Sequence, residues 1–171
     1  MELHMRSHRW EDRAPEWVPA MVAGFLAGAL LMVLELLWST FAGSGDPWQA
    51  SHQVAALVLG PRAMESSGFV LPIVAVALVN HYVLGIVFAL VLTMIMAPLH
   101  LDSSVGMAAV AGAVFGVLLY LFNFYAMVYF YPWMASMRGL PTLLAQIAFG
   151  VTAAVAYWRL RLPMESMRRR S

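Results

Sequence analysis

The sequence predicts an all-α, polytopic membrane protein with four transmembrane helices, arranged as two hairpins, and a short external interfacial helix. Its 171 residues are 62% hydrophobic and only 11% charged, whereas average soluble chains are about 25% charged. Four apolar stretches also reach the roughly 20 residues that a helix needs to cross a hydrocarbon layer of about 30 Å. So few charges on so short a chain exclude a soluble globular protein.

The four predicted spans form one domain, residues 17–160, between two polar tails. The spans cover residues 18–41, 69–97, 105–131 and 142–160. The N-terminal tail, residues 1–16, mixes acidic and basic side chains, and the C-terminal tail, residues 161–171, is rich in arginine. The N-terminal tail lacks the short apolar core and small-residue cleavage site of a signal peptide.

A shorter helix is predicted between the first two spans, at residues 47–60. Asp46-Pro47 is a favourable helix start, with aspartate as the N-cap and proline at the first helical position. Gly60-Pro61 ends the helix. It is too short to cross the membrane, so we expect it in the external interface or as a re-entrant piece.

Arginine placement predicts the orientation. There is no lysine, and eight of the ten arginines lie at the two ends of the chain: Arg6, Arg9, Arg13, Arg159, Arg161, Arg168, Arg169 and Arg170. Lysine and arginine are enriched in the short loops and tails on the cytoplasmic side of a membrane. We therefore expect a multi-pass membrane protein with both termini in the cytoplasm.

The first and third predicted spans align without gaps at an offset of 88 residues. The aligned pairs are Gly24 with Gly112, Gly28 with Gly116, and Glu35 with Asn123. Downstream, Pro47-Trp48 is repeated as Pro132-Trp133, and His81-x-x-x-Gly85 is matched by Gln146-x-x-x-Gly150. The pattern predicts an internal duplication whose copies enter the membrane in the same sense, a parallel repeat.

Small residues four apart let two helix backbones approach closely in lipid. We therefore expect Gly24, Gly28, Gly112 and Gly116 to pack helices together, in a pseudo-symmetric contact between the first and third spans.

Five polar residues interrupt the apolar spans and are predicted to meet inside the bundle. They are Glu35, Asn80, His81, Asn123 and Gln146. A glutamate in hydrocarbon must be protonated, paired or close to water. Glu35 and His81 are the most informative pair, because such a pair can hold or pass a proton. Three interpretations stay open: interhelical hydrogen bonding, a proton or solute path, and a site that faces a partner subunit.

Several chemistries are excluded at this level. Cysteine is absent, which removes disulfides and thiol catalysis. His81 is the single mid-membrane histidine, whereas a haem with two axial histidines needs two at one depth. The sequence shows no nucleophile–base set, phosphate-binding loop or zinc spacing. We expect no enzymatic activity, no cofactor, no metal and no nucleic-acid partner.

Asp46-Pro47-Trp48, the segment 55–60 (Ala-Ala-Leu-Val-Leu-Gly) and His81-Tyr82-x-x-Gly85 resemble an uncharacterised family of small, four-helix bacterial inner-membrane proteins. The resemblance implies that this chain is located in the bacterial inner membrane. Members of the family are sometimes labelled sodium:proline symporters. This chain departs from the family in having His52 where the resemblance leads us to expect a basic residue. Such symporters use many more helices than four, so the resemblance implies a fold and no function.

Two functions follow as expectations. The first is a non-catalytic accessory or scaffolding subunit of a larger membrane complex, for example a respiratory one. The alternative is a small, oligomeric proton or solute conductor that uses Glu35 and His81. The expected partners are the lipid bilayer and either other membrane subunits or further copies of the chain.

Overall fold

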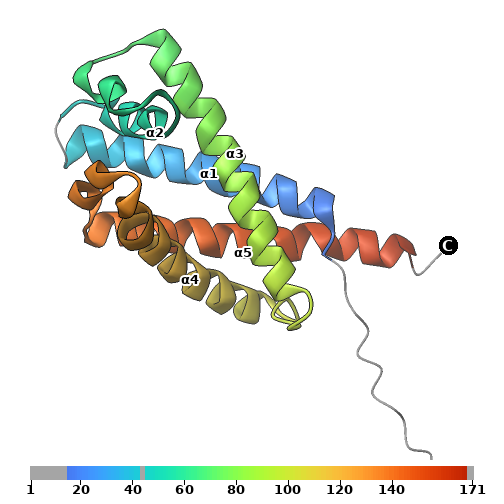
Figure 1. The fold of residues 1–171 in the computed structure, drawn as a ribbon. Helices are drawn as coiled ribbons and strands as arrows, with labels where there is room; N and C mark the ends of the chain where they lie inside the picture. Colours follow the sequence, from blue (N-terminus) through green and yellow to red (C-terminus); the bar gives the residue numbers. More distant parts are fainter. Residues whose placement is uncertain (1–14, 43–44, 169–171) are drawn as a thin grey trace, which may run out of the picture.

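The computed structural model describes residues 15–42 and 45–168, which are almost entirely helical (Figure 1). The elements are α1 (Trp17–Phe41), α2 (Gln49–Leu59), η1 (Pro61–Glu65), α3 (Leu71–Met96), α4 (Val105–Leu121), η2 (Phe122–Ala126), η3 (Met127–Tyr129), η4 (Pro132–Met137) and α5 (Leu140–Arg168). No strand occurs in these ranges. Most of the N-terminal tail, including Arg6, Arg9 and Arg13, and the last residues, including Arg169 and Arg170, lie outside the described residues.

Four helical stretches are long and apolar enough to span a membrane, which confirms the predicted fold class. They are Trp17–Phe41, Leu71–Met96, Val105–Tyr129 and Leu140–Leu162. Each exceeds the roughly 20 residues that a bilayer core requires. In α1, small residues such as Ala20, Ala23 and Ala27 are fully buried, whereas Phe25 and Leu26 are exposed. The small side chains therefore face other helices and the large apolar ones are available to lipid.

The helices pack as two pairs joined through α1 and α5. α1 packs against α3 on one side and against α5 on another, and α4 packs against α5. Figure 1 shows α1 and α5 running antiparallel while α3 crosses them. α3 and α4 are joined by a short connection yet make few contacts with each other. They diverge from that connection, which leaves space between them.

Glycines form the closest contacts within each pair. A Cβ atom added to Gly24 of α1 would lie 2.7 Å from the carbonyl oxygen of Gly85 in α3. A Cβ atom added to Gly116 of α4 would lie 2.6 Å from the Cα atom of Ile147 in α5. Gly112 of α4 likewise faces Gly150 of α5, so close that a methyl group would overlap its backbone. These helices approach backbone to backbone, which only glycine permits.

The expected glycine contact between the first and third spans is therefore wrong. The glycines of α1 face α3, and those of α4 face α5. The physical reason is that α3 and α5 each supply a glycine of their own, Gly85 and Gly150, and glycine facing glycine allows the closest approach. The two pairs show the same arrangement, as a duplicated hairpin would, although the duplication itself stays a prediction.

α2 begins at Gln49, two residues later than predicted, and its N-cap is Trp48. Asp46 lies before the helix, where its carboxylate accepts hydrogen bonds from the backbone N–H of Trp48 (2.9 Å) and of Gly68 (3.1 Å). These two bonds lower the pKa of Asp46 below its usual value. α2 also packs against α3 through Ala55, Ala56 and Ala77. It is thus part of the bundle at one end, which we call the loop end.

The third span ends in irregular turns. α4 stops at Leu121 and continues as a π-helical turn, η2, then as the 3₁₀ turns η3 and η4. Arg138 donates from Nε to the carbonyl oxygen of Phe124, 2.7 Å away, and its guanidinium lies over the ring of Tyr125. The widened turn leaves carbonyl groups without helical partners, and Arg138 satisfies one of them.

The opposite end of the bundle, which we call the terminal end, joins the start of α1, the α3–α4 connection and the last part of α5. The backbone N–H of Glu16 donates to the hydroxyl of Tyr157 (3.2 Å). Arg161 pairs with Asp102, and both are buried. α5 continues to Arg168, so the predicted C-terminal tail begins inside this helix, and Arg161 is a packed residue.

Candidate functional site

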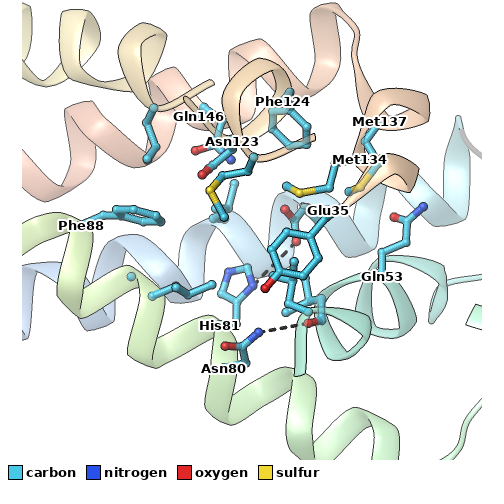
Figure 2. A pocket seen from close by; sticks show the side chains of 18 of the residues that line it. Glu35, Gln53, Asn80, His81, Phe88, Asn123, Phe124, Met134, Met137 and Gln146 are labelled. Atoms are coloured by element: carbon cyan, nitrogen blue, oxygen red, sulfur yellow. Dashed lines mark hydrogen bonds and ion pairs between the residues drawn. The ribbon is translucent and has the colours of Figure 1, made fainter. Parts of the chain in front are cut away.

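A cavity of about 490 Å³ lies at the loop end of the bundle, and we call it the inner cavity. All five polar residues singled out in the sequence line it: Glu35 from α1, Asn80 and His81 from α3, Asn123 from η2 and Gln146 from α5. Figure 2 shows these side chains projecting toward the same space. Residues from four different segments thus converge on one site.

Glu35 and His81 form the ionisable pair of this site. Nδ1 of His81 lies 3.9 Å from Oε2 of Glu35, and its Nε2 lies 3.0 Å from the carbonyl oxygen of Gly28. A carbonyl oxygen only accepts hydrogen bonds, so Nε2 carries a hydrogen and donates it. Nδ1 is therefore the nitrogen that gains or loses a proton, and it faces the carboxyl group.

The three amides of the site have different roles. Asn80 donates from Nδ2 to the carbonyl oxygen of Val54, 3.0 Å away, and so fastens α3 to α2. Gln146 is 5% exposed, and its Oε1 has no hydrogen-bond partner. Asn123 sits in the π-helical turn, a feature that is frequent at functional sites. Asn80 thus has a clear structural function, whereas Gln146 presents a free acceptor.

Sequence reasoning missed the residues that close the inner cavity at the loop end. Tyr131, Trp133 and Met134 come from η4 and the turn before it, and Gln53 comes from α2. The indole N–H of Trp133 is buried and has no hydrogen-bond partner. The repeated Pro-Trp pair marked this segment in the sequence, but nothing in the pattern indicates that it folds back over the bundle.

A second cavity of about 780 Å³, the outer cavity, lies beside the first at the same end. Glu35, Gln53 and Met137 line both cavities. The outer cavity is bordered by the exposed residues Gln49 and Ser136. The side chain of Glu35, 25% exposed, therefore borders both cavities.

The bundle is sealed below the inner cavity, toward the terminal end. A buried cluster of apolar side chains fills this part: Ala27, Leu31, Ala89, Leu92, Met96, Ala108, Leu119, Phe149, Ala153 and Ala154. Within the described residues, this cluster separates the polar site from the terminal end. The polar site therefore lies on the loop-end side of this cluster.

A scan of protein-family models, a search of curated proteins and a search of solved structures returned no significant match. The resemblance noted from the sequence therefore stays a prediction. Within residues 15–42 and 45–168, no group of three or more acidic, histidine or cysteine side chains is placed to hold a metal ion. Any functional conclusion must come from the geometry of the two cavities.

Proposed function

We propose that this integral membrane protein takes up a small solute or a proton at the inner cavity, with Glu35 and His81 as the exchanging pair. One observation carries the proposal: the acidic, histidine and amide side chains singled out in the sequence all line a single cavity, and Glu35 also borders the second one. Burying polar groups in a membrane is costly, so their convergence on a cavity favours a functional site.

The proton chemistry of the pair is simple. Because Nε2 of His81 donates to Gly28, Nδ1 and the Glu35 carboxyl group are left to share one exchangeable proton. The cavity is large enough to hold several water molecules, which would relay that proton over the 3.9 Å between the two groups. Glu35 then exchanges with the outer cavity, and His81 lies deeper.

Proton flux into proteoliposomes, followed with a pH-sensitive dye, tests this function. We expect flux with the wild-type protein and at least a tenfold loss with Glu35→Gln or His81→Gln, because an amide cannot titrate. The control is Glu65→Gln, which changes an exposed carboxylate on η1 away from both cavities.

Each variant is also checked for folding by size-exclusion chromatography in detergent. Flux equal to that of empty vesicles for the wild-type protein, together with no saturable solute uptake, would contradict the proposal. Flux that survives in both amide variants would remove Glu35 and His81 from it.

A second candidate is an accessory or scaffolding subunit of a larger membrane complex, such as a respiratory one. The apolar cluster at the terminal end favours it, because within the described residues this cluster separates the polar site from that side. A pull-down of the native protein in mild detergent, followed by mass spectrometry, separates the two. A stoichiometric set of other membrane subunits supports the accessory role, and a monomer or homo-oligomer argues against it.

A further inference from the structure

The inner cavity is lined by an acidic side chain but by no permanently basic one among the described residues. Among the described residues that line it, Glu35 is the only one with a carboxyl group, and none is a lysine or arginine. Arg138 lines the outer cavity instead, where it donates to the carbonyl oxygen of Phe124 and covers the ring of Tyr125. His81 and the phenol of Tyr131 are the remaining titratable groups. The cavity therefore offers no fixed positive charge to match a carboxylate.

One buried hydrogen-bond acceptor of the cavity is left without a donor. Oε1 of Gln146, on a side chain that is 95% buried, has no donor in the protein. Its position on α5 lets it reach the same space as Glu35 on α1. A buried acceptor without a donor is uncommon in native structures and indicates an unseen partner. Two acceptors, one of them acidic, thus converge from different helices.

The remaining wall is apolar, and it includes several aromatic rings. Phe88, Phe122, Phe124, Tyr131 and Trp133 line the cavity, together with several methionines and leucines. Faces of aromatic rings attract cations, and more strongly where water is excluded. A volume of about 490 Å³ lies within the usual range for small-molecule sites. The cavity suits a compact molecule that is mostly apolar and carries a positive charge.

We propose that the inner cavity binds a protonated organic amine with a bulky apolar body. The ammonium group donates hydrogen bonds to the carboxylate of Glu35 and to Oε1 of Gln146, and the apolar body packs against the aromatic wall. The indole N–H of Trp133 is left for water or for an oxygen on the ligand. This inference rests on the proposed function, because it names the solute class of the same site.

The charge requirement is tested with three ligands that share one cage: 1-adamantylamine, which is cationic at neutral pH, 1-adamantanol, which is neutral, and 1-adamantanecarboxylate, which is anionic. Binding to the full-length protein in lipid nanodiscs is measured by isothermal titration calorimetry against empty nanodiscs. We expect saturable binding of the amine, at least tenfold weaker binding of the alcohol, and no binding of the carboxylate.

Variants of Glu35 and Gln146 test the two contacts proposed for the ammonium group. Glu35→Gln and Gln146→Leu should each weaken amine binding at least tenfold, Glu35→Asp should restore most of the loss, and Glu65→Gln should bind as the wild-type protein does. Equal binding of amine and alcohol, or amine binding unchanged in Glu35→Gln, would overturn the inference. Proton flux that depends on Glu35 without any amine binding would also overturn it and leave the proposed function standing.

Discussion

At the residue scale, the two glycines that align between the halves are not equivalent. A Cβ atom on Gly116 would lie 2.6 Å from the Cα atom of Ile147, whereas one on Gly28 would meet nothing nearer than 3.7 Å. Overpacking a close contact costs about 1–3 kcal/mol. We therefore expect Gly116→Ala to lower the thermal unfolding midpoint in detergent by several degrees and Gly28→Ala to leave it unchanged. If Gly116→Ala and Gly28→Ala unfolded at the same temperature, the backbone contact of α4 with α5 would be contradicted.

The polar residues of the site were predictable because each interrupts an apolar run. Glu35 and His81 stand out in any scan for charge within a span, and in the structure they lie 3.9 Å apart. Trp133 was not predictable as a lining residue, because its place depends on how the segment 130–139 folds back. The extra room at Gly28 was equally hidden, since residue spacing does not show how closely α1 approaches α3 at each glycine.

At the element scale, a buried ion pair fastens the α3–α4 connection to α5. Asp102 is 0% exposed and Arg161 is 6% exposed, and Nη2 of Arg161 also donates to the carbonyl oxygen of Asp102, 2.6 Å away. Removing one partner of a buried pair usually costs about 3–5 kcal/mol, because the other charge loses its compensation. We expect Asp102→Ala to destabilise the protein by that amount in a chemical unfolding experiment.

Two further variants serve as a control and a rescue for Asp102→Ala. Glu65→Ala removes an exposed carboxylate and should change stability little. The double variant Asp102→Leu with Arg161→Met replaces the pair by apolar side chains and should regain much of the loss. If Asp102→Ala were as stable as the wild-type protein, the ion pair would not anchor the connection.

The positions of the four spans followed from length and hydropathy, but their ends did not. Hydropathy alone does not distinguish an α-helix from a π-helical turn, so the third span was expected to run as one helix to residue 131. The turn at Phe122–Ala126 instead depends on Arg138, which reaches it from 14 residues later in the chain. α5 runs past its predicted end to Arg168, and Arg161, a charge typical of a tail, pairs with Asp102 inside the bundle.

At the scale of the whole molecule, the site exists because α3 and α4 diverge. Each helix packs closely on its own partner through glycines, and the pairs meet along α1 and α5. The space between the diverging helices is filled by apolar side chains at the terminal end and left as the inner cavity at the loop end. Such a division follows from helix crossing angles, which the residue spacing in the sequence does not specify.

The packing of α1 against α5 and the positions of the arginines predict the orientation of the protein in the membrane. The start of α1 and the last part of α5 meet at the terminal end, since Glu16 contacts Tyr157. The start of α1 and the last part of α5 therefore lie on one side of the bundle. Eight of the ten arginines lie in the chain before Trp17 or after Trp158, and positive residues stay in the cytoplasm. We expect both termini to be cytoplasmic, and both cavities to open toward the external side.

Fusions to the C-terminus measure this directly. A green fluorescent protein fusion should fluoresce, since it folds in the cytoplasm, and an alkaline phosphatase fusion at the same point should be inactive. Phosphatase inserted after Glu65, at the loop end, should be active. Replacing Arg168, Arg169 and Arg170 by glutamine should reduce the difference between the reporters, because it weakens the charge bias that fixes the orientation. An active phosphatase at the C-terminus would invert the topology and make the cytoplasm the side from which Glu35 is reached.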